Sequence, residues 1–544
     1  MTGIRRSPRR AAARRPYLAE AMQLVTDLDY DPWGSVGASL YETARVTSLA
    51  PWLPGHGQRL AWVLDQQAED GSWGTGPAPY RLLPTLSAVE ALLSHVLDTG
   101  GGPQRERCAA AAAAGLAAAR NLTAAGPWPD TAAIELLVPS LTARINEHLD
   151  QPSAGASAHL GPLARETLLA VPPPFLPRRH EQAAQRCRSQ GLVPVKHHHT
   201  FEYIARHVPG IEVPLHDGLL GSSPAATAAW AANAPTGHRE QAVTALSAVA
   251  GRYGGLFPET APFTTVERLW AAAALARPGL PPACAPTVQA WALGIHHAAG
   301  VRGAPGLLPD ADDTAMTVLV AALAGAPFDP AALFPFWGTT HYQCYIDEDT
   351  GSVTANAHAL QALTAFTRCW PAASALHRPH RDLVRAWLLE QQHDDGTWTD
   401  KWHASPYYAT ERCVRALAGH TGPGTLDALR SAADWVLDSQ QDDGTWGVWG
   451  GTPEETAYAV NILLNTPAVA DGPGYDRALE RAEAALDAVG RECHHHPALW
   501  HDKTLYAPAA MIEAEVTAAR ELLRTRPGAG VPGGSRKRRG PRDS

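Results

Sequence analysis

The apolar and polar positions of this chain follow a helical pattern along most of its length. Apolar runs such as 60–64, 315–323 and 383–389 are separated by short turns rich in Gly and Pro. Runs of β-branched residues, which are typical of strands, are few. The pattern therefore predicts helices joined by turns.

A turn motif recurs three times, each time behind a helical stretch. It consists of Gln, three residues, Gly, any residue and Trp, and it occurs at 67–73, 392–398 and 440–446. We expect the Gly to stop the preceding helix in a left-handed conformation and the Gln amide to bond freed backbone groups. We expect the Trp to pack against the next helix. Three copies indicate a helical-repeat architecture, in which helical hairpins commonly close into an α/α barrel.

Three carboxylates lie close together just before the apolar run 315–323. They are Asp310, Asp312 and Asp313. Like charges at short range raise at least one pKa, and burial raises it further, so the cluster could keep a proton at neutral pH and act as a strong acid. The alternative is an ordinary helix start, where an Asp caps the helix and the helix dipole favours the anion.

Several further segments, taken with this cluster, favour the catalytic acid over the ordinary helix start. They are Ser-Leu-Tyr-Glu-Thr-Ala at 39–44, the Asp-Gly to Thr-Ala segment at 217–228, Glu-Arg-Leu-Trp at 267–270, and the segments 400–410 and 499–508, which contain one Trp each. Together they resemble the bacterial class II diterpene cyclases of labdane type, the copalyl diphosphate synthase-like family. The resemblance extends from about Tyr30 to about Leu523. It departs from the family pattern at Glu42, where the family has Asp.

The resemblance implies an all-α fold with two α/α-barrel domains, a γ domain inserted into a β domain. The ends of the chain differ from the middle, with a basic arm and a tail rich in Gly, Pro and Arg, and both are expected to be disordered. The expected boundaries are 1–15 for the arm, 16–45 for the first helix of β, 46–278 for γ, 279–524 for the rest of β, and 525–544 for the tail.

The same resemblance assigns roles in the reaction. Asp312 is expected to protonate a carbon–carbon double bond, while Asp310 and Asp313 hold its geometry and its proton; the three carboxylates titrate as a unit. His358 falls at the position that orients the acid, with Asn356 nearby. The alternative for His358 is an ordinary buried histidine.

The carbocation that follows must be shielded from water, and aromatic faces can stabilise it by about 1–2 kcal/mol each when desolvated. Fewer than half of the candidates are expected to face the cavity, because most aromatic side chains are core. The candidates are Trp337, Tyr342, Tyr345, Trp402, Tyr407, Tyr408 and Trp449.

The substrate of such an enzyme carries a diphosphate, which needs cations. Lys196, Lys401 and Lys503 are the lysines outside the tail of a chain that otherwise uses Arg. A compact point charge would explain them; chance is the alternative, because three sites are few. By the resemblance Mg²⁺ is an expected cofactor, but the segment that aligns with the acidic cluster of the plant enzymes, 126–130, keeps only one acid, Asp130.

The sequence also predicts what happens to the product. No Asp-Asp-x-x-Asp motif for diphosphate ionisation is present, so the diphosphate should survive, and a downstream class I terpene synthase is a conceivable partner. His199 aligns with the histidine that orders the final water in ent-copalyl diphosphate synthases, but the matching stretch 254–258 lacks the partner Asn. We therefore expect a product other than the plain ent-copalyl skeleton. The His runs 197–199 and 494–496 are expected to be structural or solvent-facing, because consecutive residues rarely bind one metal ion.

Composition narrows the class further. The 544 residues carry a net charge of -9, which does not indicate a nucleic-acid partner. No signal-peptide hydrophobic segment and no apolar run long enough to cross a bilayer are found, so neither a signal peptide nor a transmembrane segment is expected. Seven cysteines without a CxxC pair favour reduced thiols and a cytoplasmic location, and a homodimer is a further expectation.

The leading hypothesis is a class II cyclase that converts geranylgeranyl diphosphate to a bicyclic labdane-type or rearranged (clerodane- or halimane-type) diphosphate. Farnesyl diphosphate with a drimane-type product is the nearest alternative. A squalene cyclase would carry more Gln-Trp turns, and a protein prenyltransferase β subunit would need a Zn²⁺ site of Asp, Cys and His, for which no clear spacing is found. The non-enzyme alternative is a catalytically silent barrel that serves as a binding module.

Overall fold

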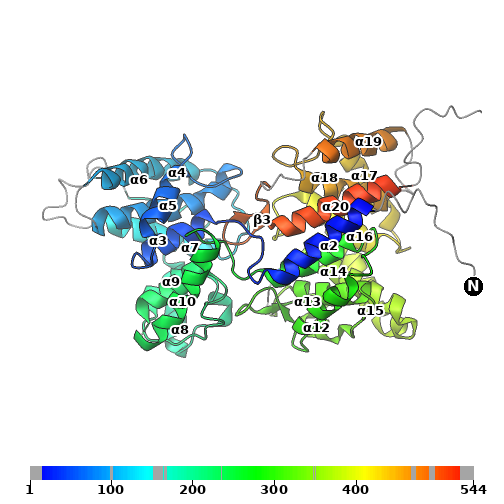
Figure 1. Ribbon diagram of the computed structural model, residues 1–544, viewed down its shortest axis with the longest axis horizontal. Helices are drawn as coiled ribbons and strands as arrows, with labels where there is room; N and C mark the ends of the chain where they lie inside the picture. The colour runs from blue at the N-terminus through cyan, green and yellow to red at the C-terminus, as the bar shows by residue number, and fades with distance from the viewer. Residues whose placement is uncertain are drawn as a thin grey trace, which may run out of the picture.

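The computed structural model describes residues 15–98, 102–150, 163, 168–234, 236–346, 348, 351–466, 473–488 and 496–526. Nearly all of the predicted basic arm and tail lies outside this part of the chain. The described residues are mostly helical, with only two short hairpins of strands (Figure 1). The all-α class and the two-barrel architecture predicted from the sequence are confirmed.

The β domain is a closed ring of helices surrounded by a second layer. Within the described residues, each of six inner helices contacts the next, and the last contacts the first. The inner helices are α11 (Thr264–Leu275), α13 (Ala311–Leu323), α14 (Val353–Cys369), α16 (Pro406–Leu417), α18 (Pro453–Asn465) and α20 (Ala509–Thr525). The outer layer is α2 (Arg15–Tyr30), α12 (Ala285–Ile295), α15 (Ser374–Glu390), α17 (Thr425–Asp438) and α19 (Pro473–Ala488), with the 3₁₀ turns η5 (Pro330–Phe336) and η6 (Pro371–Ala373).

The γ domain repeats this plan with a shorter inner ring. Its inner elements are α3 (Leu40–Leu49), α5 (Ala78–Asp98), α7 (Ile134–Leu149), the 3₁₀ turn η3 (Phe201–Tyr203) and α9 (Pro224–Asn233). Its outer elements are α4 (His56–Asp65), α6 (Pro103–Leu122), α8 (Arg179–Gln190) and α10 (Thr236–Arg252), with the turns η2 (Val195–His197) and η4 (Ala205–His207) nearby.

The hydrophobic cores place the domain boundaries differently from the sequence. The β core contains Tyr17 and Val36 and resumes at Phe263, whereas the γ core begins at Tyr41. Helix α3 therefore belongs to γ and helix α11 to β, so the expected boundaries at 45 and 278 move to about 37–40 and about 262. Helices of both domains share the same periodicity, so only their packing partners decide where each one belongs.

The three Gln-Trp turns have one geometry. Each Gln Nε2 donates to the Gly carbonyl of its own turn and to a carbonyl of a neighbouring helix, at 2.9–3.0 Å in all six bonds. Each Trp Nε1 donates at 2.7 Å to a carbonyl of the preceding helix. The glycines do have positive φ, between 83° and 88°. They lie inside the turn, however, several residues past the helix end, so the prediction that they cap the helix directly is corrected.

These glycines predict a measurable loss of stability on substitution. At Gly396 φ is +88°, and an added Cβ would lie 2.5 Å from the backbone oxygen of Ser431. Since neither backbone can move without breaking the turn, we expect Gly396→Ala to lower the free energy of unfolding by about 2 kcal/mol or more. Denaturant unfolding would measure this. The matched control is Gly294→Ala in the helix α12, which meets nothing within 4 Å and should leave stability unchanged or raise it by about 0.4–1 kcal/mol.

Two hairpins bring the chemistry into position. Strands β1 (Val301–Arg302) and β2 (Pro309–Asp310) lead into α13. Strands β3 (Trp500–His501) and β4 (Leu505–Tyr506) precede α20 and lie between the two domains (Figure 1). Within the described part of the chain, none of the helices combines the length and apolar character needed to cross a membrane, and the cysteines described there are free thiols.

Candidate active site

The three carboxylates predicted as the acid lie at the start of α13, and all three are buried. Asp310 is the N-cap, and its Oδ1 accepts a hydrogen bond from the Asp313 amide at 2.7 Å. Gly303 leaves room for the third carboxylate, because a Cβ there would lie 2.7 Å from Asp313 Oδ2. Asp310 is therefore the N-cap of α13, which was the alternative to catalysis in the sequence analysis. It also belongs to the close carboxylate cluster, so the two roles occur together.

Burial raises the pKa of two of these groups. It raises the pKa of Asp310 to about 7, with the nearby Asp312 carboxylate adding to the rise and the hydrogen bonds from Asp313 opposing it. Burial likewise raises the pKa of Asp313 well above its usual range, helped by the neighbouring Asp310. The cluster thus holds a proton at neutral pH, as a general acid requires.

The remaining carboxylate, Asp312, meets the predicted histidine. His358 Nδ1 lies 2.6 Å from Asp312 Oδ1, and the imidazole edge packs against Trp270, with 5.4 Å between ring centroids. The structure thus brings together two residues that are 46 positions apart. Asn356 lies elsewhere: its amide is fully used in holding the backbone of Tyr342 and Ser352, at 2.8–2.9 Å. It shapes the wall beside the cluster and makes no contact with the acid.

The raised pKa values predict how activity depends on pH. Because the pKa of Asp310 is about 7, Asp310 keeps its proton below that pH and begins to lose it above. Turnover should therefore fall as pH rises through about 7 and beyond, about tenfold per pH unit once the proton is lost. A profile of kcat against pH, with folding checked by circular dichroism, measures this. Turnover that keeps rising to pH 9 would contradict it.

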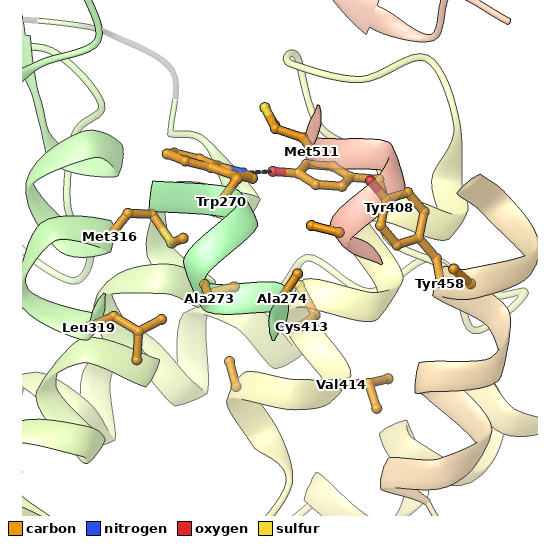
Figure 2. Packing of buried hydrophobic residues seen from close by; sticks show 14 of the residues in the cluster. Trp270, Ala273, Ala274, Met316, Leu319, Tyr408, Cys413, Val414, Tyr458 and Met511 are labelled. Carbon is orange, nitrogen blue, oxygen red and sulfur yellow. Dashed lines mark hydrogen bonds between the residues drawn. The ribbon is translucent and has the colours of Figure 1, made fainter. Parts of the chain in front are cut away.

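An aromatic wall extends from His358 across the barrel. Trp270 Nε1 donates to the Tyr408 hydroxyl at 2.9 Å, as Figure 2 shows, and Met316 and Met511 lie beside the pair. The ring of Tyr408 lies 4.8 Å from that of Trp500. Both Trp270 and Tyr408 are buried. The motif Glu-Arg-Leu-Trp at 267–270 was recognised in the sequence, but no role was predicted for Trp270, because helix α11 was placed in the other domain.

Two aromatic candidates pack against the outer helices, which corrects the prediction that they contact the substrate. Tyr407 donates to Ser439 and packs on Trp435 of the outer helix α17, at 4.4 Å between centroids. Trp337 packs between Tyr342 and His380 of the outer helix α15. Neighbouring residues of a helix point in directions about 100° apart, so Tyr408 faces the wall while Tyr407 cannot.

Two further candidates, Tyr345 and Trp402, pack together, and one lies at the domain boundary. The rings of Tyr345 and Trp402 meet at 6.4 Å, and the ammonium of Lys401 lies over both, at 5.8 and 5.2 Å. Lys401 forms an ion pair with Glu348. Trp449 is partly exposed and contacts Tyr80 of the γ domain, with 5.2 Å between centroids.

Lys503 is fully buried between the domains. Its ammonium donates to Glu42 at 2.6 Å, to Ser223 at 2.7 Å and to Glu202 at 3.0 Å. Burial alone would lower its pKa, but the two carboxylates outweigh burial and raise the pKa above its usual value. All three ammonium protons are used within the interface, which argues against the predicted place on a diphosphate.

His199 also lies at this boundary, and its ring is occupied on both sides. Nδ1 lies 2.7 Å from the carbonyl oxygen of Gly221, and Nε2 lies 3.0 Å from Asp502 Oδ1. Both partners are acceptors, so both ring nitrogens carry protons. Burial alone would lower the pKa of His199, but the Asp502 carboxylate outweighs burial and raises that pKa. An imidazolium cannot accept a further proton, so this geometry argues against the predicted base. Its neighbours point elsewhere, as expected: His197 lies against Tyr203 and His198 against the Val193 carbonyl.

Lys196 borders a cationic pocket of the γ domain, with a volume of about 300 Å³. Arg179 and Arg186 of α8 also line it, together with His197 and Glu135. Burial lowers the pKa of His197 to about 4, and the nearby Lys196 and Arg186 charges lower it further. Positive potential therefore gathers here, as an anion site requires.

The expected metal ion finds little support in these side chains. Asp130, the single acid of 126–130, is exposed, and among the described residues no three His, Cys, Asp or Glu side chains form a group that could hold a metal. Mg²⁺ commonly binds one or two carboxylates plus substrate phosphates. The residues present do not make a metal site by themselves, and no step of the reaction is assigned to Mg²⁺.

Comparison with known proteins identifies the family of this chain. The squalene-hopene cyclase C-terminal domain matches residues 335–468. Over 96% of its length the chain is 62% identical to a copalyl diphosphate synthase of Streptomyces cyslabdanicus, of which it covers 98%. It belongs to the bacterial class II diterpene cyclases. This cyclase is also 46% identical to the labda-7,13-dienyl diphosphate synthase of Streptomyces clavuligerus, with 98% of both chains covered.

The fold of the cyclase agrees with its family. The solved structure of an ent-copalyl diphosphate synthase from Streptomyces platensis is 40% identical and has a TM-score of 0.85, covering 93% of this chain and 99% of that one. The sequence-based assignment to class II cyclases is thereby confirmed. The roles of the individual site residues stay predictions.

Proposed function

We propose that this cyclase converts geranylgeranyl diphosphate to a bicyclic, copalyl-type diphosphate by protonation. The observation that carries the proposal is the buried carboxylate cluster with His358 bound to Asp312 at 2.6 Å. The names of relatives at 46–62% identity, copalyl and labda-7,13-dienyl diphosphate synthases, support the bicyclic diphosphate product.

In the proposed mechanism, one oxygen of Asp312 carries the transferable proton. We assign the donor role to His358 Nδ1, 2.6 Å from Asp312 Oδ1, which leaves Oδ2 as the oxygen that carries the transferable proton. The π electrons of the terminal double bond form a new C–H bond with this proton, the O–H bond breaks, and a tertiary carbocation remains beside the Asp312 carboxylate. Two ring closures follow, each consuming a double bond, and loss of a proton from carbon restores one. Trp270 and Tyr408 present the aromatic wall that stabilises the cation and excludes water.

The diphosphate group fits the cationic pocket around Lys196. Three cationic side chains, Lys196, Arg179 and Arg186, line it, and the uncapped N-terminus of α7 begins at its edge. Helix N-termini favour anions. Mg²⁺, if used, would arrive with the diphosphate, because the chain supplies few ligands of its own.

The first prediction of this proposal is that the diphosphate survives. Purified protein given geranylgeranyl diphosphate should yield a cyclic alcohol only after phosphatase treatment, as measured by gas chromatography with mass spectrometry. Direct release of a hydrocarbon would contradict it. Parallel reactions with farnesyl diphosphate test the shorter substrate, and a faster drimane-type reaction would replace the proposal. A retained diphosphate would also suit a class I terpene synthase acting next.

A second prediction concerns the carbon skeleton of the product. Because His199 is paired with Asp502 in place of an Asn, we keep the prediction that plain ent-copalyl diphosphate is not the sole product. Chiral analysis of the dephosphorylated alcohol decides this, and ent-copalol alone would refute it.

A further inference from the structure

One partly buried carboxylate near the acid has no role in the steps above. Asp400 lies in the loop before α16, and its two oxygens accept five hydrogen bonds. Oδ1 accepts from Ser352 Oγ at 3.0 Å, Val353 N at 2.6 Å and Thr354 N at 3.2 Å. Oδ2 accepts from Thr354 Oγ1 at 2.9 Å and Trp402 N at 3.2 Å.

Four of these five donors belong to Ser352, Val353 and Thr354 at the start of α14, the helix that carries His358. Helix α14 already has an N-cap, because Ser352 Oγ accepts from the Ala355 amide at 3.1 Å. Asp400, from a distant loop, takes the amides of Val353 and Thr354, which the N-cap leaves unpaired. Burial raises the pKa of Asp400, while the hydrogen bonds from Thr354 and Ser352 oppose the rise. Five donors converge on a carboxylate whose burial is costly, which indicates a fixed position.

Lys401, the residue after Asp400, links the same loop to a second segment beside the acid cluster. Lys401 pairs with Glu348, whose carboxylate accepts from the Tyr345 amide at 3.2 Å. One residue before Tyr345, the Cys344 carbonyl accepts from the amide of Ala311, beside the acid cluster, at 2.9 Å. The 400–401 loop is thus attached both to the start of α14, the helix that carries His358, and to the 344–348 loop, which bonds the start of α13.

We propose that Asp400 is a positioning residue for the acid. It holds the first turn of α14 so that His358, five residues further along the helix, meets Asp312 Oδ1 and directs the proton to Oδ2. A helix rises 1.5 Å per residue and moves as a rigid unit, so a shift of its first turn carries to His358. The proposal rests on the proposed function for its kinetic readout, but the contact itself can be tested without substrate.

The experiment combines Asp400→Asn with His358→Ala in a double-mutant cycle. Asn offers one acceptor oxygen and places an NH₂ donor against donors, so the first turn of α14 loses part of its attachment. We expect kcat to fall about 10- to 100-fold with KM nearly unchanged. In the His358→Ala background the same change should cost about twofold or less, because Asp400 acts through His358. The matched control is Asp395→Asn, an exposed carboxylate that bonds Thr397 in the same domain.

A second measurement does not need turnover. The proton between His358 Nδ1 and Asp312 should give a strongly downfield NMR signal, assigned by its loss in His358→Ala. We expect it to vanish or shift in Asp400→Asn and to persist in Asp395→Asn. Equal kinetic losses in both backgrounds, or an unchanged signal in folded Asp400→Asn, would overturn the proposal. A wild-type protein that leaves geranylgeranyl diphosphate unchanged would refute the proposed function, and the NMR result would still decide the role of Asp400.

Discussion

Replacing Asp312 by Asn should abolish cyclisation. An amide cannot give up a proton to an alkene, and the other two carboxylates are held differently: Asp310 caps the helix, and Asp313 lies over Gly303. We expect kcat to fall by about 10⁴-fold, the upper end for loss of a general acid. Turnover of geranylgeranyl diphosphate, quantified as the dephosphorylated product, measures it.

Fold and affinity should survive this change, because Asn has nearly the same shape as Asp. Thermal unfolding and binding of a non-reacting prenyl diphosphate analogue should match wild type within about twofold in Kd. The control variant is Asp329→Asn, an exposed helix cap whose carboxylate bonds Ala331; it should retain full activity. A folded Asp312→Asn protein with near-normal kcat would assign the acid elsewhere.

Replacing Lys503 by Ala should cause the largest loss of stability. The change removes the ammonium that is paired with both Glu42 and Glu202, whose side chains are almost completely buried with it. Breaking a buried ion pair in this way leaves uncompensated charge and costs about 3–5 kcal/mol of unfolding free energy. Denaturant or thermal unfolding measures the loss, and the two domains should begin to unfold separately, because Lys503 joins β to γ.

The matched control is Arg430→Ala, which removes an exposed ion pair with Asp427 at 3.1 Å. Exposed pairs contribute about 0–1 kcal/mol, so stability should change little. The same Lys503→Ala preparation separates the two roles considered for this residue. A large rise in KM with unchanged stability would restore the predicted diphosphate role, whereas lost stability with nearly unchanged KM supports the structural one.

Local patterns in the sequence determined the helices, the Gln-Trp turns and the acid. Each depends on residues close together in the chain: periodicity sets a helix face, Gly permits the positive φ of a turn, and Asp310, Asp312 and Asp313 are neighbours whatever the fold. The alignment of His358 with the acid came from family resemblance, and the 2.6 Å contact agrees with it.

Only the tertiary structure decided which side chains face one another across long separations. Tyr407 and Tyr408 are adjacent in sequence, but one packs on the outer helix and the other on the wall beside Trp270. Lys503 and His199 resembled substrate and base residues, yet each meets a carboxylate brought from another domain. Helix α11 joined the β core because its apolar face fits that ring. A charged or aromatic side chain can belong equally well to an active site or to the core. Its packing partners decide which, and the sequence alone does not show them.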